Sequence, residues 1–162
     1  MGVFIYCYTA TGKSTLGKKY ANVIDMESTK YKYGEQIENE KAKGTKRTIN
    51  PEYPQNYFKA LEEVKDKYDY ILISDSVCND WLFKNKIEYW QIYPDKSLRE
   101  EYLFRMKNRG NNQDFIDYQS LLWDEWIEGC MTDKNASRHI VLQAGQHLED
   151  VLPNLVLKEL KC

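Results

Sequence analysis

The stretch Gly-Val-Phe-Ile-Tyr-Cys-Tyr-Thr-Ala-Thr-Gly-Lys-Ser-Thr at residues 2–15 decides the fold. Its apolar run over 3–8 predicts a buried strand, and the amphipathic pattern from Lys13 to about Tyr20 predicts the helix that follows. The connection between them ends in Gly-Lys-Ser, the ending of a phosphate-binding loop. A tight loop between a strand and a helix N-terminus turns backbone N–H groups and a partial positive charge toward a phosphate.

Each residue type at the end of this loop has a predicted task. Gly12 permits unusual backbone angles, Lys13 reaches the β- and γ-phosphates, and the hydroxyl of Ser14 is a ligand for Mg²⁺. One departure is Cys7, because the full pattern has glycine five residues before Gly12. The residues expected to bind the nucleotide are Thr9, Ala10, Thr11, Gly12, Lys13, Ser14 and Thr15.

Composition limits the classes of protein that remain. The 162 residues suffice for one domain over 1–162, and the net charge of −2 argues against bulk binding to nucleic acid or anionic membrane. No apolar run approaches the ~20 residues of a membrane span, and no basic region precedes the first short apolar run, as it would in a signal peptide. The four cysteines are far apart, so we expect free thiols in a reducing cytoplasm: Cys7, Cys78, Cys130 and Cys162.

Strand and helix patterns alternate along the rest of the chain. Further strands are predicted over 22–28, 68–76, 87–93 and 138–143. Helices are predicted over 50–67, 77–85, 97–108 (capped by Ser97), 112–128 and 147–160, the last interrupted near Pro153. This alternation predicts an α/β fold of three layers, α/β/α, around a parallel five-stranded sheet.

Carboxylates follow two of the predicted strands, at the sheet edge where such folds bind ligands. We expect Asp75 to hold Mg²⁺ beside Ser14, although a loop-capping role is the alternative. Asp25 is expected to face the phosphoryl acceptor, with Glu27 as second choice; a solvated turn is the alternative for both.

The segment 96–112 carries three of the five arginines, Arg99, Arg105 and Arg109. Arg105 and Arg109 are four residues apart and share a helix face, so we predict a mobile lid whose arginines stabilise charge on the transferred phosphoryl group. The alternative is a solvated basic helix that pairs with Glu100 and Glu101.

Two further segments have predicted binding roles. Residues 29–50 carry acidic and then basic side chains and little apolar periodicity, which predicts an exposed helix or loop that serves as a mobile acceptor segment; a solvated surface segment is the alternative. Within it, Tyr31 and Tyr33 either stack on a planar acceptor or are core or interface aromatics. After the last strand, the backbone around Gly145 is expected to pack against the purine of ATP, and neither His139 nor His147 is predicted to be catalytic.

Taken together, these residues resemble the small P-loop nucleoside and nucleotide kinases, especially the short forms carried by phages. The matching positions are Gly12-Lys13-Ser14-Thr15, Asp25, Asp75, Tyr93-Pro94, Arg105 with Arg109-Gly110-Asn111, and Gly145. The resemblance implies a P-loop nucleotide-kinase fold, a mobile arginine-bearing lid, and ATP- and Mg²⁺-dependent phosphoryl transfer to a nucleotide or nucleoside.

A nucleoside monophosphate is the favoured acceptor, and other functions stay open. A nucleoside, a sugar or a small acid is an alternative acceptor for a kinase of this kind. A P-loop module that binds nucleotide without turnover is an alternative from another class. A kinase of nucleic-acid ends is disfavoured by the acidic net charge and favoured only by the basic patch at 41–47. Oligomeric state is not predicted.

Overall fold

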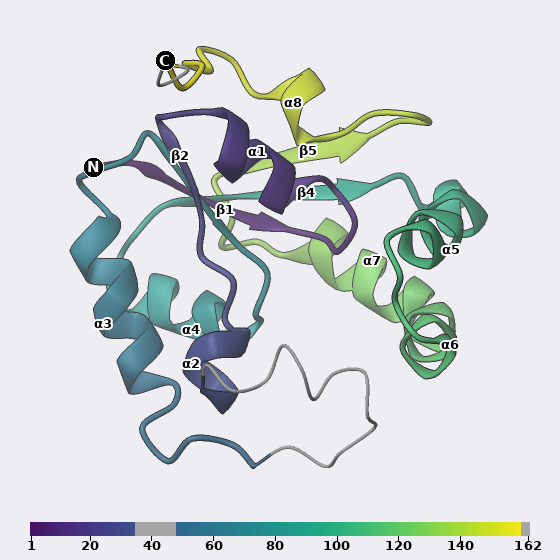
Figure 1. The fold of residues 1–162 in the computed structure, drawn as a ribbon, viewed down its shortest axis with the longest axis horizontal. Coiled ribbons are helices and arrows are strands. Elements are labelled where there is room, and N and C mark those ends of the chain that lie inside the picture. The colour runs from purple at the N-terminus through teal and green to yellow at the C-terminus, as the bar shows by residue number, and fades with distance from the viewer. Residues whose placement is uncertain (35–47, 160–162) are drawn as a thin grey trace.

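The computed structural model describes residues 1–34 and 48–159. Its centre is a sheet of five parallel strands in the order β2-β3-β1-β4-β5, with helices on both faces (Figure 1), which confirms the predicted α/β fold of three layers. The strands are β1 (Val3–Cys7), β2 (Val23–Asp25), β3 (Tyr70–Ile73), β4 (Tyr89–Pro94) and β5 (Arg138–Leu142). The helices are α1 (Lys13–Lys19), α2 (Thr29–Tyr33), α3 (Gln55–Val64), α4 (Val77–Lys84), the 3₁₀ turn η3 (Lys96–Leu98), α5 (Arg99–Asn108), α6 (Gln113–Leu121), α7 (Trp123–Thr132) and α8 (Leu148–Val151).

The apolar run of β1 is continuous because both of its faces are covered. Phe4 and Ile5 are adjacent in sequence and wholly buried, yet they join different core clusters. Ile5 packs in the cluster that includes Leu16 of α1 and Leu148 of α8, whereas Phe4 packs in the cluster of α3 and α4. Successive strand residues point to opposite faces, so each face of the central strand contributes to a separate core layer.

A third apolar cluster lies at the carboxyl end of the sheet. It joins Tyr8 and Tyr93, just beyond β1 and within β4, to buried residues of α5, α6 and α7 such as Trp123. In Figure 1 α5 and α6 lie beyond the tips of the strand arrows, and α7 runs from there back along the sheet. The sheet edge to which the sequence assigns ligand binding is therefore enclosed by helices on one side.

The predicted helix over 112–128 is wrong as a single element. It breaks at Leu122, and α6 and α7 lie on either side of the break. Immediately after it, Trp123 is 1% exposed, and its indole N–H donates to the carbonyl of Lys96 at 2.9 Å. Tertiary burial of this large ring thus overrides a locally favourable helix.

Two other predicted helix starts differ from the structure. The helix predicted over 50–67 begins only at Gln55, after the turns that contain Pro51 and Pro54. Asp95, not Ser97, caps the next turn, because its carboxylate accepts from the N–H of Ser97 at 3.0 Å.

The helix predicted over 147–160 ends at Val151, and the chain then runs back toward α1 in extended form. Pro153 follows two residues later and Asn154 has a φ of 56°. Both residues disfavour continuation of a helix.

Residues 35–47 and 160–162 lie outside the described part of the chain, and with them most of the predicted acceptor segment 29–50, its basic patch and Cys162. Over the described ranges, none of the helices has the length and apolar character needed to cross a membrane.

Candidate active site

The predicted phosphate-binding loop leaves β1 at Cys7 and enters α1 at Lys13. Gly12 has a φ of 96°, a left-handed conformation that favours glycine. Lack of room for a side chain does not explain the glycine, because a Cβ at this position would lie 3.5 Å from the ring of His147, an ordinary van der Waals distance. Inside the loop, the hydroxyl of Thr11 donates to the carbonyl of Tyr8 at 2.8 Å, and the carbonyl of Thr11 accepts from the N–H of Leu148 at 3.1 Å.

Cys7, which stands where the pattern has its first glycine, belongs to the strand and not to the turn. It is the last residue of β1, in register with Ile92 of β4, and is wholly buried. Burial raises the pKa of its thiol, which keeps it neutral. The left-handed angles fall later, at Ala10 (58°) and Gly12.

Arg105 connects the loop after β1 to two neighbouring segments by hydrogen bonds. Its guanidinium donates to the carbonyl of Ala10 at 3.2 Å, to the carbonyl of Gln146 at 2.8 Å and to the carboxylate of Glu101 at 2.6 Å. Glu101 in turn accepts from the N–H of Gly145 at 3.0 Å. The side chain of Arg105 is only 13% exposed. Arg105 and Gly145 thus meet in one network behind the loop, and neither lines the cleft in front of it.

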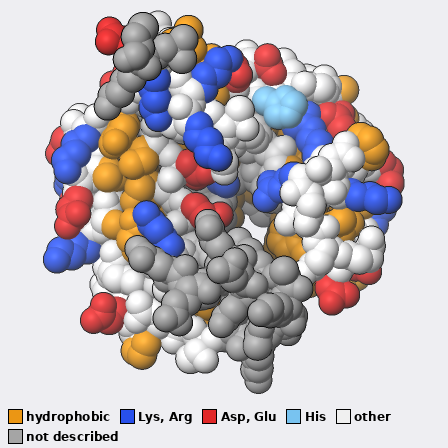
Figure 2. Space-filling view, viewed as in Figure 1, with side chains coloured by type: hydrophobic (Ala, Val, Ile, Leu, Met, Phe, Trp, Pro, Cys, Tyr) orange, Lys and Arg blue, Asp and Glu red, His pale blue; other side chains and the backbone are white. Residues whose placement is uncertain are grey.

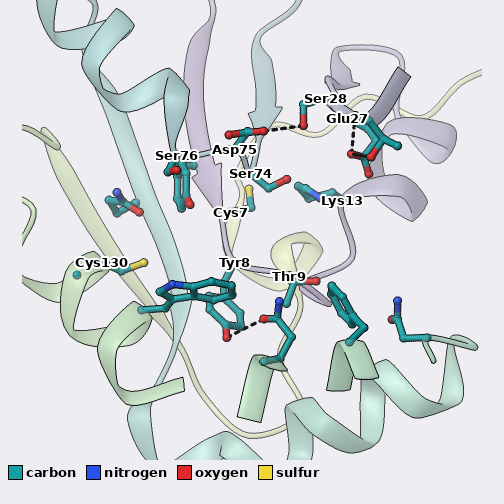
Figure 3. A pocket seen from close by; sticks show the side chains of 18 of the residues that line it. Cys7, Tyr8, Thr9, Lys13, Glu27, Ser28, Ser74, Asp75, Ser76 and Cys130 are labelled. Atoms are coloured by element: carbon teal, nitrogen blue, oxygen red, sulfur yellow. Dashed lines mark hydrogen bonds between the residues drawn. The ribbon is translucent and has the colours of Figure 1, made fainter. Parts of the chain in front are cut away.

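That cleft has a volume of about 1130 Å³, and it opens at the carboxyl edge of the sheet. Figure 2 shows the surface hollowed near the middle of this face. Thr9 and Lys13 of the loop line it, together with the ends of β1 and β3, the entrance to α2, the turn between α5 and α6, and one face of α7. Lys13 and Glu27 lie toward one end and Cys130 toward the other, with Tyr8 between them (Figure 3).

Ser14 pairs with Asp25, the last residue of β2. Its hydroxyl donates to Asp25 Oδ2 at 3.0 Å. The other oxygen, Oδ1, is buried without a hydrogen-bond partner. Burial raises the pKa of this carboxyl above its ordinary value, while the nearby ammonium of Lys13 and the hydroxyl of Ser14 oppose the rise. An orphaned carboxylate oxygen beside a serine hydroxyl supplies the hard oxygen donors that Mg²⁺ prefers, so these residues fit the metal that the motif implies.

Asp75 sits at a junction of hydrogen bonds. One of its oxygens accepts from the hydroxyls of Ser28 at 3.0 Å and Tyr53 at 2.7 Å, and the other accepts from the N–H of Val77 at 3.2 Å. Asp75 also lines the cleft. The N–H contact two residues on is the loop cap of the alternative interpretation, although the carboxylate still faces the site.

Two more of the charged residues singled out in the sequence face the cleft. Arg109 directly follows α5 and lines the cavity, so the two predicted arginines differ in position: Arg109 faces the cleft, whereas Arg105 contacts the loop. Glu27 also lines the cavity and accepts from the backbone N–H and the hydroxyl of Thr29.

The aromatic and histidine residues singled out in the sequence have structural contacts. Tyr31 packs against the buried ring of Tyr57, with centroids 5.1 Å apart. The backbone N–H of His147 binds Asp150 in a capping box, and His139 Nε2 lies 3.0 Å from the carbonyl of Asp133.

The polar residues deep in the cleft were missed. Gln91, Asn79 and Gln119 line it and were not singled out. A signal existed for Gln91, a lone polar residue inside the apolar run of β4. No pattern pointed to Asn79 or Gln119, because their place in the cleft depends on how α4 and α6 pack.

No protein-family model matches the sequence, and no curated protein sequence matches it. The structure is similar to the crystal structure of a gluconokinase from Sinorhizobium meliloti 1021, with a TM-score of 0.50. The match covers 93% of this chain and 86% of that chain at 14% sequence identity. At this identity the likeness establishes the fold, which is the P-loop kinase fold.

Proposed function

We propose that the protein is a kinase that transfers the γ-phosphoryl group of ATP, with Mg²⁺, to a small molecule, and that the acceptor is a nucleoside monophosphate. The observation that carries this proposal is the position of Lys13. It ends a Gly-Lys loop at the carboxyl edge of a parallel sheet and faces a cleft large enough for a second substrate. The same proposal includes a relationship to the short phage kinases and residence in a reducing cytoplasm. Such a compartment suits the free thiols of Cys7, Cys78 and Cys130.

Phosphoryl transfer requires mainly positioning and neutralisation of charge. Lys13 binds the phosphates through its ammonium, and Arg109 approaches the transferred group from the turn after α5. Mg²⁺, when bound, would neutralise charge on the phosphate oxygens. Its candidate ligands are Ser14 and the carboxylates of Asp25 and Asp75, and the contact between Ser14 and Asp25 favours Asp25.

If Asp25 is a ligand of the metal, Glu27 is the carboxylate that faces the acceptor. Glu27 lines the large cleft, whereas Asp25 lines a smaller pocket beside α1. A carboxylate at the position of Glu27 can accept a hydrogen bond from the acceptor, and the proton itself when the acceptor is a hydroxyl.

An acceptor without a phosphate is the second candidate. Among the described residues, the charged side chains that line the cleft are three acidic ones and two basic ones: Glu27, Asp75, Glu125, Lys13 and Arg109. This balance suits an uncharged acceptor hydroxyl, as in a nucleoside or a sugar. The structural neighbour is a gluconokinase, which keeps a sugar acid among the acceptors to be tested.

The deciding experiment measures ADP formed from ATP and Mg²⁺ with each member of an acceptor panel. The panel contains nucleosides, their 5′-monophosphates, sugars, gluconate and short oligonucleotides. We expect ADP release to depend on one small-molecule class, and to be lost in Lys13→Ala. ATP binding without ADP release for any acceptor would indicate a nucleotide-binding module instead.

A further inference from the structure

Gln91 carries a hydrogen-bond acceptor atom with no partner, deep in the cleft. The side chain is 1% exposed and lines the cavity from β4. Its amide nitrogen donates to Asp133 Oδ2 at 2.8 Å, while its amide oxygen Oε1 is buried and has no hydrogen-bond partner. A buried polar atom left without a partner destabilises the protein, so its retention in a cavity suggests a ligand that supplies a donor.

The orientation of this amide is set by its neighbours. Asp133 Oδ2 also accepts from the hydroxyl of Tyr89 at 2.6 Å. Although burial opposes it, these hydrogen bonds hold the pKa of Asp133 below its ordinary value, so the carboxylate is ionised and can only accept. The amide of Gln91 must therefore keep its nitrogen toward Asp133. As a result, its oxygen is the atom left to contact a ligand.

The side chains around Gln91 are suited to a planar, ring-shaped ligand. Tyr6 of β1 is in register with Gln91 on the neighbouring strand, so the two side chains share a face of the sheet. Tyr6 and Trp126 of α7 both line the cavity. Asn79 of α4 lines it too, and its amide oxygen is also buried without a partner. Aromatic rings beside neutral amide groups are the lining that planar, polar ligands require.

Charge separates this end of the cleft from the phosphate end. The cations that line the cavity, within the described part of the chain, are Lys13 of the loop and Arg109 of the turn after α5. Cys130, one helical turn beyond Trp126, lies at the opposite end from Lys13 (Figure 3). The charged group that α7 adds to the lining is Glu125, an acid. A carboxylate or phosphate would be repelled here, whereas N–H donors would be accepted.

We propose that this end of the cleft binds the nucleobase of the acceptor, and that an N–H group of the base donates to Gln91 Oε1. Asp133 is a positioning residue for this contact. The inference rests on the proposed phosphoryl transfer to a nucleotide or nucleoside, and it specifies where the base of that acceptor binds and which side chain recognises it.

Binding measurements test the inference without any need for turnover. Thymidine, cytidine, adenosine and guanosine, each as nucleoside and as 5′-monophosphate, are titrated by calorimetry into the wild-type protein and into Gln91→Met, which has similar volume and no amide. Each base is compared with its counterpart methylated at the donor nitrogen, such as N3-methylthymidine or N4,N4-dimethylcytidine. We expect methylation to weaken binding to the wild type at least tenfold, and to change binding to Gln91→Met by less than threefold.

Tyr89→Phe is the matched control, because it also removes one donor to Asp133 but leaves the Gln91 amide in place. It should keep the discrimination against methylated bases. Asp133→Asn frees the amide to turn, and should raise KM for the acceptor with little change in kcat once turnover is established.

The inference is overturned if no base binds the wild type, if methylated bases bind as well as the natural ones, or if Gln91→Met discriminates as the wild type does. If Gln91→Met does not fold, the comparison of bases on the wild type still decides. ADP release with gluconate and no binding of any base would overturn the inference and leave the kinase activity standing. Base binding without ADP release would overturn the kinase and leave the subsite standing.

Discussion

Replacement of Arg105 by alanine should destabilise the whole protein, and not only slow a reaction. The guanidinium donates to the carbonyls of Ala10 and Gln146, pairs with Glu101, and lies 4.5 Å from the ring centroid of Tyr102. Ala10 has a left-handed φ of 58°, an unfavourable angle for a residue with a Cβ, so the loop depends on such external contacts.

The magnitude follows from the lost contacts. A hydrogen bond from a charged donor contributes about 1.5–3 kcal/mol. Both carbonyls can regain water after truncation, so we take the lower value for each of the two and expect a loss of about 3 kcal/mol in the free energy of unfolding. For a chain of this length, that corresponds to a fall in Tm of roughly 6–12 °C. An arginine that served only as a surface ion would contribute about 0–1 kcal/mol.

Thermal unfolding of Arg105→Ala, Arg105→Lys and Arg109→Ala measures this. Lysine keeps the charge but lacks the planar fork that reaches two carbonyls, so Arg105→Lys should recover less than half of the lost stability. A Tm of Arg105→Ala within 1 °C of wild type, together with a tenfold or larger fall in kcat, would show that Arg105 does not stabilise the loop and would assign it to a lid that closes over ATP.

Three further outcomes are expected. Arg109→Ala should lower kcat at least tenfold and Tm by no more than about 3 °C, because Arg109 faces the cleft; a kcat within twofold of wild type, with the true acceptor, would remove Arg109 from the site. Asp25→Asn should abolish the rise in Tm that Mg²⁺-ATP gives and leave the unliganded Tm unchanged or higher, since burial disfavours the charge of Asp25. Asp75→Asn should instead lower the unliganded Tm, because it disturbs the hydrogen bonds that Ser28, Tyr53 and the N–H of Val77 donate to this side chain. The reverse pattern would assign the metal to Asp75. The lowered pKa of Asp133 stabilises the folded protein above the ordinary carboxyl pKa of about 3.9, and this stability is lost as the pH falls through the lower pKa of the folded state. The free energies of unfolding of wild type and Asp133→Asn should therefore converge in acid. A constant difference between them from pH 7 to pH 2 would contradict this.

The sequence was sufficient for the layers of the fold, because local pattern determined them. An apolar run followed by Gly12 and Lys13 predicts a strand, a tight loop and a helix, as β1 and α1 show. The alternation of strands with helices along the rest of the chain then favours a parallel sheet. The break at Leu122 was not predictable, because it depends on where the ring of Trp123 finds a buried position and a carbonyl partner.

The candidate site was predictable only where chemistry is local. Lys13 and Ser14 are recognised from three consecutive residues. The hydrogen-bond partner of Ser14 could not be recognised in the same way, because Asp25 and Asp75 both stand at the ends of parallel strands. Only the packed structure shows that Asp25 lies 3.0 Å from the hydroxyl. Likewise, spacing placed Arg105 and Arg109 on one helix face but did not distinguish the side chain bound to the loop from the one that faces the cleft.

Calorimetric titration of ATP with Mg²⁺ into wild type and Lys13→Ala decides whether Lys13 binds the phosphates of ATP. Lys13 lines the cleft and is not part of the three apolar core clusters, so the variant should keep the Tm of the unliganded protein. We expect the wild type to bind ATP and the variant to bind it at least a hundredfold more weakly, since a charge-assisted contact to phosphate of about 3 kcal/mol is lost. Equal affinity of the two proteins for ATP, or no binding by either, would show that Lys13 does not hold the phosphates.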